Sequence, residues 1–165
     1  MGLMVCGTYD QNDKYEREHY IPFFLGKGEK KFDEIKERYN GIIAELGIDL
    51  SLDEQYENIK AGFKGRAGRD YAASRGEYLN GIILAKYIGY EFIDAADLVF
   101  FNEDGTFNAD MTNQTVRDRL VDVERAVIPG FYGAMPDGTI KTFSRGGSDL
   151  TGSIVAKAAK VDLYE

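Results

Sequence analysis

The stretch that decides the fold runs from Val127 to Thr151 and reads VIPGFYGAMPDGTIKTFSRGGSDLT. Its pattern of apolar residues and turn residues predicts two strands, over 126–132 and 139–143, with a turn between them. A glycine-rich loop then leads into a helix predicted over 148–160. Such a loop leaves backbone N–H groups free at the positive end of a helix dipole, so the sequence indicates a place suited to an anion.

The residues of this loop leave two interpretations open. Arg145 carries a rigid guanidinium that can bind a carboxylate through two parallel hydrogen bonds, which favours a ligand site. Alternatively, Gly146 and Gly147 make a tight turn, and Ser148 or Asp149 caps the helix that follows. A second feature that points to the same loop is needed to decide between them.

Helices and short strands precede this stretch. Apolar residues recur every three or four positions and predict helices over 29–46, 51–63, 69–88 and 112–124. Short apolar pieces predict further strands over 90–93, 98–101 and 161–164. Helices followed by alternating strands and helices are typical of an α/β layered fold. We therefore expect one domain over 29–165, preceded by an irregular segment over 1–28.

Composition excludes several classes of protein. The 165 residues carry 28 Asp and Glu against 20 Lys and Arg, for a net charge of −8, and no third of the chain is basic, which argues against a nucleic-acid surface. Cys6 and His19 are single residues of their types, so the sequence predicts no internal disulfide, zinc site or Ser-His-Asp triad. The apolar runs are too short to span a bilayer. We expect a soluble, cytoplasmic protein without a membrane partner.

Three motifs carry a resemblance to a known family. Phe131 with its flanking glycines, followed by Arg145-Gly146-Gly147-Ser148-Asp149, resembles the G-F-x-G and T-x-x-R-G-G-S-D motifs of the aspartate kinases in the amino acid kinase family. Upstream, Ser74-Arg75-Gly76-Glu77-Tyr78-Leu79 is similar to that family's S-x-G-E-x-L motif. The resemblance implies a three-layer α/β sandwich of the carbamate kinase-like type.

The resemblance also implies a role for each matched residue. Arg145 would hold a carboxylate of L-aspartate, while Glu77 and Asp149 would face its ammonium group. Phe131 would form a wall of the pocket. The remaining matched positions would shape and support the loop, namely Gly146, Gly147, Ser148 and Thr151.

The implied reaction is the ATP-dependent phosphorylation of the side-chain carboxylate of L-aspartate, with Mg²⁺, as the first step of lysine, threonine and methionine biosynthesis. That carboxylate is ionised at neutral pH, so the transfer needs positioning and charge stabilisation but no general base.

The chain departs from the family at both ends. The family's K-F-G-G-S segment does not precede Glu29, and its T-D-V-D-G segment would follow the last residues, 161–165. We therefore expect a truncated kinase domain that keeps the aspartate pocket, lacks parts that hold ATP, has little activity alone and forms a homo-oligomer through unpaired strand edges. The alternative is a non-catalytic module for amino-acid binding or assembly.

Overall fold

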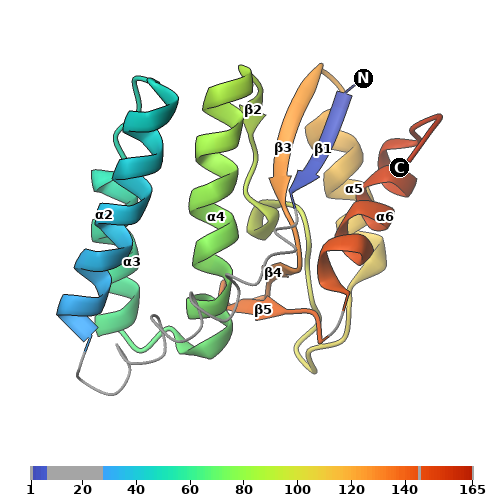
Figure 1. Ribbon diagram of the computed structural model, residues 1–165. Helices are drawn as coiled ribbons and strands as arrows, with labels where there is room; N and C mark the ends of the chain where they lie inside the picture. Colours follow the sequence, from blue (N-terminus) through green and yellow to red (C-terminus); the bar gives the residue numbers. More distant parts are fainter. Residues whose placement is uncertain (1, 7–27, 145, 165) are drawn as a thin grey trace.

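The computed structural model describes residues 2–6, 28–144 and 146–164, and is drawn in Figure 1. The helices are α2 (Gly28–Leu46), α3 (Asp53–Lys64), α4 (Gly68–Ile88), the short 3₁₀ helix η1 (Ala95–Asp97), α5 (Ala109–Leu120) and α6 (Gly147–Ala159). The strands are β1 (Gly2–Cys6), β2 (Glu91–Phe92), β3 (Arg125–Pro129), β4 (Tyr132–Ala134) and β5 (Ile140–Thr142).

A parallel sheet in the order β1-β3-β2 forms the centre of the fold. Strand β3 lies in the middle, with Val5 of β1 opposite Ile128 and Phe92 of β2 opposite Val127. Figure 1 shows α4 on one side of this sheet and α5 and α6 on the other. This arrangement gives the α/β class that the sequence predicts. Residues Ala126–Pro129 of β3 are buried, as expected for a strand covered on both faces.

A second sheet continues from the carboxyl end of β3. Strands β4 and β5 pair antiparallel, with Tyr132 opposite Thr142. The backbone of β4 also approaches the segment after η1, because the Ala134 N–H donates to the Val99 carbonyl at 2.8 Å. Gly133 allows this approach, since a Cβ there would collide with that carbonyl oxygen.

The beginning of the chain corrects the expectation of an irregular segment over 1–28. Gly2–Cys6 forms β1, and helix α2 begins at Gly28. The apolar run over Gly2–Cys6 is too short to show a periodicity that distinguishes a strand from an irregular segment. The sequence pattern alone could therefore not assign it. The rest of the expected irregular segment, 7–27, lies outside the described residues.

The strand expected over 161–164 is also wrong. Among the described residues this segment pairs with no strand. Instead, Lys160 adopts a left-handed conformation with φ 53°, and the Val161 N–H donates to the Ala156 carbonyl at 3.2 Å. This hydrogen bond satisfies a carbonyl at the end of α6. The apolar residues after α6 therefore belong to the helix terminus rather than to a β-sheet.

Two apolar cores support the fold. The first joins α2, α3 and α4 through buried residues such as Phe32, Tyr56 and Leu79. The second surrounds the sheet and includes Leu98, Ile128 and Val155. Within the described residues, no helix has the length and apolar character needed to cross a membrane.

Candidate functional site

The glycine-rich loop begins α6 with a glycine cap. Gly146 is the N-cap and has a left-handed backbone with φ 57°. A glycine has no side chain, so it cannot satisfy the amides of the first helical turn. Ser148 and Asp149 take the second and third positions of the helix, which excludes both as the N-cap residue. Asp149 is exposed in this first turn, where a carboxylate is favoured by the helix dipole.

The turn between β3 and β4 packs directly against this helix start. A Cβ at Gly130 would lie 2.9 Å from the Oγ of Ser148, and one at Gly147 would collide with Phe131. Only glycines therefore permit the two segments to approach so closely. The structure thus places the Phe131 turn beside the Gly146-Gly147-Ser148-Asp149 helix start.

Thr151 links the turn to the helix. Its hydroxyl is fully buried, accepts a hydrogen bond from the Phe131 N–H at 3.0 Å and donates one to the Gly147 carbonyl at 2.7 Å. On the other side, the Phe131 carbonyl accepts from the Phe143 N–H at 2.8 Å. Both backbone groups of Phe131 are therefore held by hydrogen bonds, while the role of Thr151 in a site stays a prediction.

Phe131 adopts a left-handed backbone conformation with φ 65°. A non-glycine residue pays about 1–2 kcal/mol for this conformation, and such strain persists only where surrounding contacts fix it. Its ring packs edge to face on the ring of Tyr132, with centroids 5.8 Å apart. The conformation turns the chain sharply where β3 ends, beside the start of α6.

Glu77 lies on α4 and is 7% exposed. It precedes Gly81 by one helical turn, so the two share a face of the helix. A Cβ at Gly81 would lie 3.0 Å from the Phe92 ring and 3.4 Å from the Pro129 ring, at the carboxyl ends of β2 and β3. Ligands of open parallel sheets bind beyond these strand ends. Glu77 therefore lies toward the same end of the sheet as Phe131.

The remaining predicted residue is Arg145, which lies outside the described residues. Its role as the carboxylate-binding residue stays a prediction. The described residues contain no group of three or more His, Cys, Asp or Glu that could hold a metal ion.

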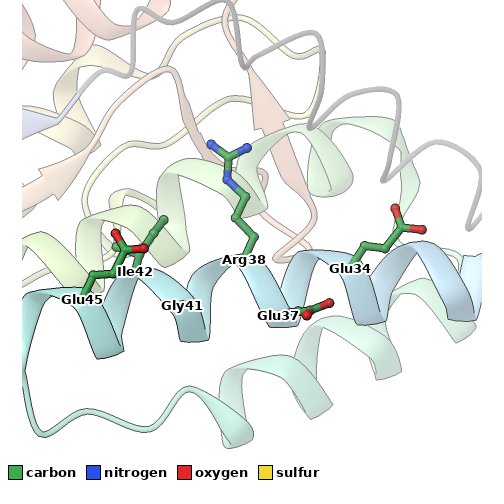
Figure 2. Close-up of a pocket in the computed structure, with 6 residues that line it drawn as sticks. All are labelled: Glu34, Glu37, Arg38, Gly41, Ile42 and Glu45. Carbon is green, nitrogen blue, oxygen red and sulfur yellow. The ribbon is translucent and has the colours of Figure 1, made fainter.

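A hollow of about 660 Å³ lies elsewhere, along α2, and is drawn in Figure 2. It is lined by Glu34, Glu37, Arg38, Gly41, Ile42 and Glu45. Figure 1 places α2 on the far side of α4 from α6. The hollow is thus separate from the predicted site, and the sequence offered no motif there.

Sequence reasoning missed a buried polar group beside the site, which we call the Arg75 cluster: Tyr71, Arg75, Tyr78, Asp94 and Tyr132. Arg75 is 6% exposed, and its guanidinium lies 4.5 Å from the ring centroids of Tyr71 and Tyr78. Burial, followed by the Asp94 charge, raises the pKa of Tyr132 well above its usual value. The sequence did hold a signal for this cluster: on a predicted helix, one tyrosine lies four residues before Arg75 and another lies three residues after it, which places all three side chains on neighbouring positions.

Two curated proteins and two solved structures are similar to most of this chain. No protein-family model matches the chain. Aspartokinase 3 of Bacillus subtilis is 31% identical over 162 residues, covering 90% of this chain and 35% of the relative. Aspartokinase 1, chloroplastic, of Arabidopsis thaliana is 33% identical over 147 residues, covering 75% of this chain and 26% of the relative.

Two solved structures of aspartate kinases also match most of this chain. The crystal structure of Clostridium acetobutylicum aspartate kinase matches 99% of this chain with a TM-score of 0.88 and 38% identity, and 39% of that chain is covered. Escherichia coli aspartokinase III, solved with aspartate and ADP, matches 98% of this chain with a TM-score of 0.77 and shares the fold at 18% identity, with 41% of that chain covered.

The fold, with its glycine-rich helix start, is an α/β fold that this chain shares with solved aspartate kinase structures. More particularly, the chain is similar to aspartate kinases, at 31–38% identity over 75–99% of its length. It spans about a third of the length of the curated relatives it matches.

Proposed function

We propose that this chain carries the L-aspartate site of an ATP-dependent aspartate kinase, in the three-layer sandwich of the amino acid kinases. The observation that carries the proposal is the packing of the Phe131 turn on the start of α6, fixed by the buried hydroxyl of Thr151. In this proposal the packing sets one wall of the pocket beside the start of α6, where the Gly146 cap offers no side chain to the first-turn amides and the carboxylate of Asp149 is exposed.

The chemistry of L-aspartate fits these groups. The substrate brings two carboxylates and one ammonium group, so it needs a positive fork and neighbouring acids. Arg145 and the amides at the start of α6 would hold a carboxylate, while Glu77 and Asp149 would face the ammonium. The second carboxylate is already ionised at neutral pH and would attack the γ-phosphoryl group without a general base.

ATP and Mg²⁺ are proposed as the phosphoryl donor and its metal ion. The E. coli relative solved with aspartate and ADP supports a nucleotide for the fold's relatives. Because the described residues hold no acidic or His/Cys cluster for a metal, we assign no residue of this chain to Mg²⁺. Bound with ATP, Mg²⁺ would neutralise charge on the transferring phosphoryl group.

The test is calorimetry of the purified chain with L-aspartate, succinate and Mg-ATP. Succinate keeps both carboxylates but lacks the ammonium, so it should bind more weakly than aspartate. E77Q and D149N should reduce that preference. D110N is the matched control, because Asp110 is an exposed acid in the first turn of α5, and it should leave the preference unchanged.

The outcomes separate the candidate functions. Binding of both aspartate and Mg-ATP supports a kinase, whereas binding of aspartate alone supports the non-catalytic amino-acid module. Equal binding of aspartate and succinate would contradict the assigned ammonium partners. The homo-oligomer and the low activity of the chain alone also remain proposals, to be checked by light scattering and by assay of aspartyl phosphate.

A further inference from the structure

The Arg75 cluster buries a full positive charge beside the proposed pocket. Burying a guanidinium is costly unless its charge and donors are compensated. Among the described residues Arg75 forms no ion pair with a carboxylate. Its Nε and Nη2 instead donate to the Ser74 hydroxyl at 3.1 and 2.8 Å. That hydroxyl in turn donates to the Tyr71 carbonyl at 2.9 Å.

Aromatic rings supply the rest of the compensation. The guanidinium lies 4.5 Å from the ring centroids of Tyr71 and Tyr78, both on α4, and 5.6 Å from that of Tyr132 on β4. A cation is attracted to the face of such rings, and the attraction strengthens when water is excluded. Tyr132 is fully buried. The contact therefore joins α4 to β4 through desolvated groups.

Tyr132 is held at its other end as well. Its hydroxyl donates to Asp94 Oδ1 at 2.7 Å, and the same oxygen accepts from the Ala96 N–H at 3.0 Å. The carboxylate of Asp94 thus fixes the tip of the ring, while Arg75 lies over the ring. Three segments, α4, the start of η1 and β4, meet at this one tyrosine.

The cluster touches both sides of the proposed pocket. Arg75 precedes Glu77 by two residues on α4. Tyr132 follows Phe131 directly, and their rings are in edge-to-face contact at 5.8 Å. A continuous line of contacts therefore leads from the helix that carries Glu77, through Arg75 and Tyr132, to the ring of Phe131.

We propose that Arg75 is a positioning residue of the aspartate site, which sets the spacing between Glu77 and Phe131 by holding the ring of Tyr132. This inference rests on the proposed function. The role does not follow from the family resemblance, because the S-x-G-E motif leaves the position of Arg75 open. A lysine could keep the charge, but it lacks the planar guanidinium that contacts three rings at once.

The experiment compares R75M, R75K and the control R69M, in which an exposed arginine of the same helix is replaced. L-Aspartate binding to the full chain is measured by calorimetry at a temperature where urea unfolding shows each variant to be folded. We expect R75M to raise Kd about tenfold and R75K about threefold, the size of a lost or weakened buried cation–π contact. R69M should bind as the unchanged chain does.

A second readout reports position without a ligand. In amide NMR spectra, R75M should shift the Phe131 resonance, whereas R69M should not. Unchanged Kd and an unchanged Phe131 resonance in R75M would overturn the positioning role while leaving the proposed function intact. Should R75M fail to fold, R75K decides, and affinity equal to that of the unchanged chain would overturn the inference. Absence of aspartate binding by the unchanged chain would instead overturn the proposed function.

Discussion

Replacing Thr151 by valine tests the link on which the candidate site depends. Valine has nearly the shape of threonine but no hydroxyl, so T151V leaves the Phe131 N–H without its acceptor. The Gly147 carbonyl is less affected, because it can still accept the helical hydrogen bond from the backbone N–H of residue 151. An unsatisfied buried donor costs about 1–3 kcal/mol. At about 2 kcal/mol, the thermal midpoint of a domain of this size falls by roughly 4–8 °C.

Serine at the same position provides the opposite change. T151S keeps the hydroxyl and removes one buried methyl group, which costs about 1 kcal/mol. Urea unfolding followed by circular dichroism should therefore rank the unchanged chain first, T151S second and T151V last. A T151V variant at least as stable as T151S would refute the reasoning, because it would show that the methyl group matters more than the hydrogen bond.

The chain contains a matched control for this effect. Thr112 of α5 is also fully buried, and its hydroxyl accepts from the Phe100 N–H at 3.0 Å. T112V should lose stability by a similar amount, but it should leave aspartate affinity unchanged because α5 carries no residue of the candidate site. T151V should lower both the stability and the aspartate affinity. Equal aspartate affinity in the two variants would separate Thr151 from the site.

Two other properties can be measured on the same chain. G133A should destabilise the fold by about 1–3 kcal/mol in urea unfolding, because the added methyl group meets the Val99 carbonyl. G41A lies on an exposed part of α2 with no atoms nearby and should stabilise the fold by about 0.5–1 kcal/mol. A G133A variant more stable than G41A would contradict the packing around Gly133. Burial raises the pKa of Tyr132 in the folded state, so the same tyrosine ionises at lower pH in the unfolded state. Its contribution to stability is therefore intact below about pH 10, the pKa of the unfolded tyrosine, and is lost as the pH rises further. Urea midpoints at pH 9 and above should fall less steeply in Y132F.

Local patterns were enough to predict where most helices lie, although the helix expected over 112–124 is observed as α5 over Ala109–Leu120. Helix α4 was expected over 69–88 and is observed over Gly68–Ile88, ending at Gly89 in a left-handed conformation. Helix α6 begins one residue before the prediction. Helix α6 has apolar residues at helical spacing and begins after a glycine, whereas α4 is buried on several faces and is marked chiefly by the glycine that ends it.

Short strands were harder to predict because their pairing depends on distant residues. The segment 98–101, expected as a strand, forms only isolated bridges, which pair Phe100 with Ala134 and Phe101 with Phe107. Strand β1 exists through pairing with β3, a segment far along the chain. No local period encodes such partners, so the sequence alone could neither exclude a strand over 98–101 nor identify the strand over Gly2–Cys6.

The same distinction applies to the site. The family resemblance was enough to associate the Phe131 turn with the start of α6, and only a hairpin separates the two segments. It could not reveal that Arg75 lies over Tyr132, since that contact joins separate layers of the fold. The long-range contact became visible only once α4, β4 and Asp94 were placed together.

These contacts explain how Phe131 keeps a strained backbone. Thr151 holds its N–H from α6, and Phe143 holds its carbonyl from the end of β5. The neighbouring ring of Tyr132 is fixed by Arg75 and Asp94. Four contacts from four separate segments oppose a cost of about 1–2 kcal/mol at one residue. Relaxation of the turn would require several of them to break together, so the wall of the proposed pocket would be set before any substrate arrives.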